Sequence, residues 1–166
     1  MTYTTSNSSA ELLSAFQALD VDQQLALFYF IYREMGDTVT PAAPAASTVS
    51  PEIAEGLFNQ VKELSQEEQL QLQRDLINRQ NKPLTRQYGA LSDTTKLLFW
   101  YNLAQGMDNG TIIPMPNDYQ LSDSAKTVLN QTKGLDFDEQ ITLFRNLVSP
   151  MGVDPTSAAQ DPNTGL

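Results

Sequence analysis

Apolar residues recur along most of this chain at intervals of three and four positions, the spacing that places side chains on one face of an α-helix. The segment 21–36 shows the pattern clearly, with Leu25, Phe28, Tyr29 and Tyr32 in helical register. Other apolar residues widen its stripe almost all round, which predicts a helix buried on several sides. No segment alternates apolar and polar residues between hairpin turns, as paired strands would. The sequence therefore predicts an all-α protein with about eight helices of modest length.

Polar residues that can cap a helix precede most of these apolar segments. The predicted N-terminal caps are Ser8, Asp20, Ser50, Ser65, Ser92 or Asp93, Ser122 and Asp136. Several of them are followed three positions later by Glu or Gln, which is the spacing of a capping box. Gly36, Gly110 and Gly134 are expected to end helices, because glycine readily adopts the conformations found at C-terminal caps. The proline-containing segment 37–50 is expected to form a non-helical connection, and a short helix is expected around 84–91.

The chain is expected to form one helical domain over residues 1–153, built from two subdomains, with a linker-like tail at 154–166. Within this domain, residues 19–36 align with residues 135–152, with eight identities in eighteen positions. The general similarity of amphipathic helices accounts for part of this match. We interpret the rest as a sign of two similar helical bundles.

Charge and composition exclude several classes of function. The net charge is −10, which argues against binding to nucleic acid or to an anionic membrane surface. The sequence has no cysteine and no histidine, so the usual zinc sites and nucleophiles activated by histidine are excluded. The acidic residues fit helix caps better than a catalytic pair. A non-enzymatic, cytoplasmic protein without a membrane span or a signal peptide is expected.

Aromatic and sulfur-containing side chains are concentrated in residues 94–119, which include Trp100, the single tryptophan of the chain. Such side chains suit a surface that follows an irregular, polarisable ligand, but they also occur in ordinary helical cores. The pattern alone leaves both interpretations open. Arg145 is unusual because it lies within the apolar stripe of the last helix, where it is either a surface residue with a buried stem or a contact for a partner.

Several short motifs, in the same order along residues 10–153, resemble the N-terminal helical domain of the orange carotenoid proteins of cyanobacteria. They are LALFYFIYREMG, AAP, KLLFWYNLAQGM, PMPNDYQLS and QITLFRNLV. The resemblance implies two interleaved four-helix bundles with a keto-carotenoid in the groove between them. The second, carotenoid-binding domain of that family is absent from this sequence. The chain therefore resembles the stand-alone helical carotenoid proteins, and an excised fragment is the alternative.

Carried over by position, the resemblance implies a set of carotenoid contacts. They are Leu25, Tyr29, Tyr32, Met35, Leu97, Trp100, Tyr101, Met107, Met115, Tyr119, Ile141, Thr142 and Val148. Trp100 and Tyr119 would flank one end ring of the pigment. Arg145 matches an arginine implicated in docking to the phycobilisome and to the second domain. Thr94 replaces an asparagine of that domain interface, which puts regulated photoswitching in doubt, and Pro41 replaces an aliphatic residue beside the tunnel.

The implied function is non-covalent binding of a keto-carotenoid such as canthaxanthin, echinenone or 3'-hydroxyechinenone. The bound pigment would serve photoprotection by quenching singlet oxygen, by dissipating excess antenna excitation, or by both. The implied partners are the phycobilisome, which would bring the protein to the thylakoid, and a separate carrier that resembles the second domain. The alternative is a helical adaptor that docks to the antenna through Arg145 and the cationic cluster of Arg79, Lys82 and Arg86.

Overall fold

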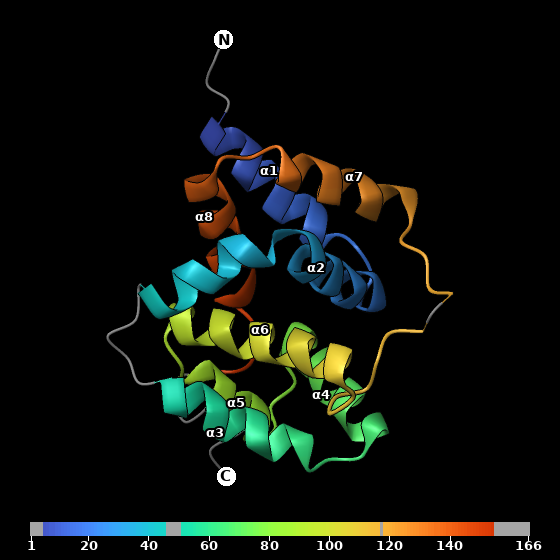
Figure 1. Cartoon of the computed structure of the whole chain (residues 1–166), viewed down its shortest axis with the longest axis vertical. Helices are drawn as coiled ribbons and strands as arrows, with labels where there is room; N and C mark the ends of the chain where they lie inside the picture. The colour runs from blue at the N-terminus through green and yellow to red at the C-terminus, as the bar shows by residue number, and fades with distance from the viewer. Residues whose placement is uncertain (1–4, 46–50, 117, 155–166) are drawn as a thin grey trace.

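The computed structural model describes residues 5–45, 51–116 and 118–154, and these ranges contain eight helices and no strand (Figure 1). The prediction of an all-α protein is therefore confirmed. In chain order the helices are α1 (Thr5–Gln17), α2 (Val21–Ala45), α3 (Pro51–Lys62), α4 (Gln66–Asn78), α5 (Pro83–Gly89), α6 (Asp93–Asn109), α7 (Asp123–Lys133) and α8 (Phe137–Val148).

Most of the predicted caps are present. Ser65 and Glu68 form a complete capping box at the start of α4, with each side chain bonded to the backbone N–H of the other residue. Asp20, Ser92, Ser122 and Asp136 each accept a hydrogen bond from the backbone N–H three residues further on. Gly110 ends α6 in the left-handed conformation, at φ 89°. The predicted cap Ser50 lies outside the described residues.

Two predicted boundaries are wrong. Helix α1 begins at Thr5, so Ser8 lies inside the helix and is not its cap. Helix α2 continues past Gly36 to Ala45, although it bends at Met35, where φ is −130° and ψ is 23°. The segment 37–45 therefore belongs to a helix. Its three alanines favour this continuation, and proline fixes φ close to the helical value.

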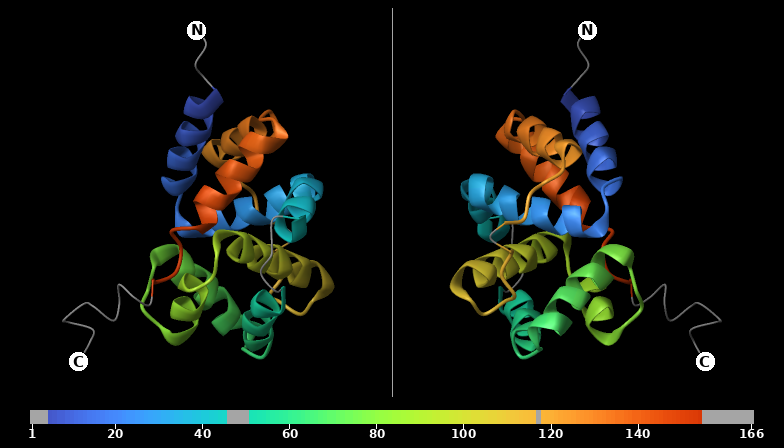
Figure 2. Two further views of the ribbon diagram at one scale, coloured as in Figure 1. Left: turned by 90° about the vertical axis from the view of Figure 1, so that its left-hand side faces the viewer. Right: turned by 90° about the vertical axis from the view of Figure 1, so that its right-hand side faces the viewer.

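The helices form two bundles that interleave along the chain. Helices α1, α2, α7 and α8 pack together, and α3 to α6 form the second group (Figure 2). The chain leaves the first bundle after α2 and returns to it at α7, and after α8 the backbone N–H groups of Gly152 and Val153 bond to α4 and α5 of the second bundle. Helices α2 and α6 form the principal contact between the bundles, and a single hydrophobic core runs through both.

The internal repeat has a different meaning from the one predicted. Its two copies correspond to α2 and α8, and these helices pack against each other in the first bundle. The two copies therefore lie in the same bundle, and the repeat does not mark one copy in each.

Among the described residues, no helix has the combination of length and hydropathy that crossing a bilayer requires.

Candidate functional site

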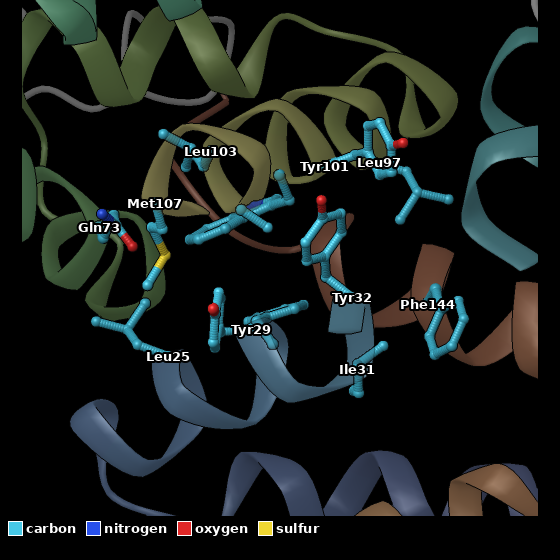
Figure 3. A pocket seen from close by; sticks show the side chains of 13 residues that line it. Leu25, Tyr29, Ile31, Tyr32, Gln73, Leu97, Tyr101, Leu103, Met107 and Phe144 are labelled. Atoms are coloured by element: carbon cyan, nitrogen blue, oxygen red, sulfur yellow. The ribbon is translucent and has the colours of Figure 1, made fainter. Parts of the chain in front are cut away.

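Two adjoining cavities lie along the seam between α2 and α6. The first has a volume of about 40 Å³ and is lined by side chains of α2, α4, α6 and α8 (Figure 3). The second has a volume of about 200 Å³ and opens beside the turn that follows α6. Leu25, Gln73 and Met107 line both cavities, so the two form one elongated groove.

Aromatic rings dominate the first cavity. The ring of Phe28 stacks on the indole of Trp100 at a centroid distance of 4.9 Å and an interplanar angle of 9°. Tyr32 on α2 meets Tyr101 on α6 edge to face, at 5.4 Å. Figure 3 shows the tyrosines of α2 pointing toward Tyr101 and Met107 of α6. Rings from both bundles therefore meet inside the groove, and their polarisable faces suit a conjugated ligand.

The edge of the first cavity is polar. Tyr29 on α2 donates a hydrogen bond of 2.6 Å from its hydroxyl to Oδ1 of Asp108 on α6. Arg33 donates to the same hydroxyl oxygen at 3.1 Å. Burial and the hydrogen bond to Asp108 raise the pKa of Tyr29 above its ordinary value. The phenol therefore stays protonated at neutral pH and keeps its role as donor.

A second polar cluster connects the elements that line the second cavity. The Gln23 side chain donates from Nε2 to the Tyr119 hydroxyl at 2.9 Å, and its Oε1 accepts from the Ser122 backbone N–H at 2.8 Å. At the mouth, Arg74 and Asp22 form a two-pronged ion pair of 2.9 and 3.1 Å. Gln23 thus fastens α2 to the segment that carries Met115 and Tyr119.

The groove contains most of the predicted contact residues. The first cavity is lined by Leu25, Tyr29, Tyr32, Leu97, Trp100, Tyr101 and Met107, and the second by Leu25, Met107, Met115 and Tyr119. The other four predicted contacts line neither cavity. Met35, Ile141 and Val148 are buried, whereas Thr142 is exposed. The sulfur of Met35 lies 3.6 Å from the amide nitrogen of Gln140.

Several lining residues were not predicted. They include Phe28, Ile31, Gln73, Leu103 and Phe144 in the first cavity, and Ile113, Pro114 and Pro116 in the second. Phe28 shares the helical stripe of Leu25 and Tyr32, so its spacing was a usable signal. Gln73 gave no such signal, because the sequence does not show that α4 reaches the seam.

Arg145, predicted as a docking residue, is half-buried on α8. Its Nε atom is buried, and it has no hydrogen-bond partner among the described residues. No group of three or more carboxylates that could hold a metal occurs in the ranges that the structure describes.

The fold and the groove define a helical binding protein for an elongated, largely apolar ligand that two bundles share. A family model described as "Orange carotenoid protein, N-terminal" matches residues 2–154. This chain belongs to that family.

Three relatives illustrate the range of proteins that it resembles. An orange carotenoid-binding domain-containing protein of Nostoc sp. (strain PCC 7120) is 47% identical over 151 residues, which are 91% of this chain and 87% of that protein. An orange carotenoid-binding protein of Limnospira maxima is 39% identical over 86% of this chain but only 44% of its own length. The solved structure of the Anabaena (Nostoc) sp. PCC 7120 red carotenoid protein binding canthaxanthin is 60% identical, with a TM-score of 0.79, and the match covers 88% of this chain and 99% of that one.

Proposed function

We propose that this protein binds a keto-carotenoid non-covalently in the groove between α2 and α6 and acts in photoprotection. The observation that carries the proposal is the continuous groove lined by aromatic and aliphatic side chains from both bundles. A carotenoid is about 30 Å long, the length of a helix of about 20 residues, so it must extend across more than one bundle. Family membership and the canthaxanthin in the related red carotenoid protein support the choice of ligand.

The residues of the groove fit such a pigment. Trp100, Tyr101 and Tyr32 offer ring faces and edges for the polyene and one end ring, while Met107 and Met115 adapt to its shape. Burial of apolar surface contributes about 25 cal/mol per Å². Each ring contact adds about 0.5–1.5 kcal/mol.

Pigment binding requires the groove to widen. A volume of about 40 Å³ in the first cavity is far smaller than a pigment about 30 Å long requires. Tyr32 and Tyr101, which both line this cavity, are in ring contact, so these rings would separate if a polyene lay between them.

The bound pigment would supply the photochemistry, by quenching singlet oxygen or by accepting excitation energy from a light-harvesting antenna. The protein would supply binding, conformation and shielding from water. Met35, Ile141, Thr142 and Val148 stay predicted contacts, to be tested with the pigment bound.

The test is to produce the protein in cells that make keto-carotenoids. Purified protein should be coloured, with an absorption band shifted from that of the extracted pigment, and chromatography of the extract should identify a keto-carotenoid. A colourless protein from pigment-producing cells would contradict the proposal. As a site control, Trp100→Ala should weaken pigment retention, whereas Gln120→Ala, an exposed change, should leave it intact.

A second function, docking to the phycobilisome or to a separate carotenoid carrier, is favoured by one observation. Arg145 is only half-buried on α8, so part of its cationic side chain remains accessible to a partner carboxylate. Pull-down with purified phycobilisomes, with and without pigment, tests this. Retention of the unpigmented protein would favour the adaptor, and Arg145→Gln should weaken the interaction if this side chain makes the contact.

A further inference from the structure

Trp100 is held by a polar contact that lies outside the groove. Its indole Nε1 donates a hydrogen bond of 2.9 Å to the hydroxyl oxygen of Tyr88, a fully buried residue of α5. Tyr88 lines neither cavity of the groove. Its hydroxyl in turn donates to the backbone carbonyl of Val148 at 2.8 Å. The direction of both bonds is fixed, because the indole nitrogen can only donate and the carbonyl can only accept.

This relay joins the two bundles. Trp100 and Tyr88 belong to the second bundle, while Val148 is the last residue of α8 in the first. The final carbonyls of a helix have no partner within the helix. Tyr88 satisfies that of Val148, and Lys96 satisfies that of Ser149 through its Nζ at 2.8 Å. The end of α8 is therefore capped by Tyr88 and Lys96, and Tyr88 also bonds to Trp100, which lines the groove.

The surroundings of Tyr88 leave its ring little freedom. Phe99 packs edge to face against it at 5.6 Å, and the Lys96 ammonium lies 5.4 Å from its centroid. A Cβ added to Gly152 would come within 2.7 Å of Cδ1 of Tyr88, so the chain after α8 also presses on the ring. A hydroxyl fixed in this way can fix the indole that bonds to it.

The orientation of the Trp100 indole is set by ring packing, from Phe28 and from Phe99 edge to face at 6.2 Å, and by the hydrogen bond to Tyr88. Phe28 stacks on one face of the indole, which sets its plane. The Tyr88 hydroxyl holds Nε1 at the edge of the ring, which restricts rotation of the side chain about χ1 and χ2. Without this hydrogen bond, ring packing alone would hold the indole, and the edge that it presents to the groove could shift.

We propose that Tyr88 is a positioning residue for the carotenoid site: through its hydroxyl it orients the Trp100 indole and couples the groove to the end of α8, without touching the pigment itself. This inference rests on the proposed function for its ligand. Its first test needs no ligand, so the two can fail separately.

The first experiment uses the unpigmented protein and the variant Tyr88→Phe, which keeps the ring and removes the hydroxyl. Because Trp100 is the single tryptophan, its signals need no deconvolution. In the variant, the indole mode that reports N–H hydrogen bonding should shift in ultraviolet resonance Raman spectra. Fluorescence anisotropy should fall, and quenching by acrylamide should rise. Unchanged signals in a folded variant would overturn the inference.

The matched control is Thr132→Val on α7, which also removes a fully buried hydroxyl that donates to a backbone carbonyl, that of Val128 at 2.7 Å. It should cost stability and leave the Trp100 signals as in the wild type. If Tyr88→Phe fails to fold, the wild-type protein decides: a Raman signature of an indole without a hydrogen bond, or easy quenching by acrylamide, would overturn the inference.

The second experiment uses the pigmented protein. Tyr88→Phe should shift the absorption band and release the pigment about tenfold faster, since loss of the hydroxyl leaves the buried indole N–H of Trp100 unpaired. Thr132→Val should leave the band in place. If the wild-type protein shows a hydrogen-bonded Trp100 but binds no pigment, the result contradicts the proposed function and leaves the Tyr88–Trp100 contact standing. Changed Trp100 signals with an unshifted band and normal release would reject the role of Tyr88 at the pigment site.

Discussion

The Tyr29 hydroxyl and the Asp108 carboxylate are joined by a hydrogen bond of 2.6 Å that connects α2 to α6, the two helices that border the groove. The same hydroxyl accepts a hydrogen bond from Arg33, whose guanidinium also lies 5.7 Å from the Tyr29 ring centre. This cluster ties together elements that must separate when the groove widens. It is therefore expected to slow the entry and exit of a long ligand.

Tyr29→Phe keeps the ring in the groove and removes the donor. The exposed Asp108 can then be solvated, so the change should cost less than about 1 kcal/mol of stability and should speed pigment uptake by up to about fivefold. Uptake can be followed by stopped-flow absorbance with pigment in detergent micelles. Asp138→Asn on α8 removes an exposed charge away from the groove and serves as control. Uptake at the wild-type rate in Tyr29→Phe would show that the bond does not limit opening.

Gln23 provides the second contact that shapes the groove. Gln23→Ala removes both the donor to Tyr119 and the acceptor for Ser122, and it should destabilise the protein by about 1–2 kcal/mol, roughly 1 kcal/mol for each hydrogen bond. It should also increase pigment loss, because Tyr119 is no longer held over the second cavity. Urea denaturation and pigment transfer to liposomes measure the two effects. Gln120→Ala should change neither stability nor pigment loss. Equal effects in both variants would show that the segment around Tyr119 is generally sensitive to substitution, and that the hydrogen bonds of Gln23 are not the cause.

The helix boundaries show what local chemistry alone can predict. Ser65 with Glu68 and Gly110 were identified correctly because a cap depends on residues within one turn. The bend at Met35 was missed, since a bend followed by more helix and a helix end after Gly36 have the same local signal. The repeat also did not reveal that its two copies pack against each other in one bundle. Two similar helices can pack together or apart, and only contacts distant in sequence decide between these arrangements.

The groove was predicted in part for the same reason. Trp100, Tyr101 and Tyr119 stand out by residue type, and the family resemblance directed attention to them. Gln73 and Tyr88 are ordinary in the sequence; their importance comes from bonds or contacts with residues that are distant along the chain or on other helices. Gln23 was predicted only as a capping partner, and its reach to Tyr119, 96 positions away, depends on the tertiary fold.

Tyrosine burial predicts how stability depends on pH. Burial raises the pKa of Tyr88 well above its ordinary value of about 10, although the hydrogen bond from Trp100 opposes this shift. The folded state thus favours the neutral phenol. Its contribution to stability is complete below the pKa of the unfolded chain and is lost as pH rises above about 10 toward the pKa of the folded state. The shifts of Tyr29, Tyr32 and Tyr119 are also upward, so they act in the same direction.

Lys96 acts in the opposite direction, because burial lowers its pKa while Asp93 and Asp154 raise it. The cost of burying its charge is relieved as pH rises through the lowered pKa. Urea denaturation between pH 8 and pH 11 should therefore show a decline in stability above about pH 10 in the wild type. The decline should be shallower in Tyr88→Phe. An equal slope in the two proteins would show that Tyr88 does not contribute to this titration.

Gly89 and Gly56 make a matched pair for testing the segment that follows α8. The Gly152 and Val153 backbone N–H groups donate to the carbonyls of Leu76 and Thr85, which fastens this segment to α4 and α5. A Cβ on Gly89 would collide with the carbonyl oxygen and carbonyl carbon of Val153. Both of these neighbours are backbone atoms, so Gly89→Ala must displace the segment and should cost about 2 kcal/mol or more.

Gly56 lies within α3, and a Cβ there would meet nothing within 4 Å. Gly56→Ala should therefore stabilise the protein by about 0.4–1 kcal/mol, because alanine loses less backbone entropy on folding and favours the helix. Chemical denaturation of the two variants should give changes of opposite sign. Because the displaced segment adjoins Tyr88, Gly89→Ala should also alter the fluorescence of Trp100, whereas Gly56→Ala should not. A Gly89→Ala protein with unchanged stability would show that the segment after α8 does not press on α5.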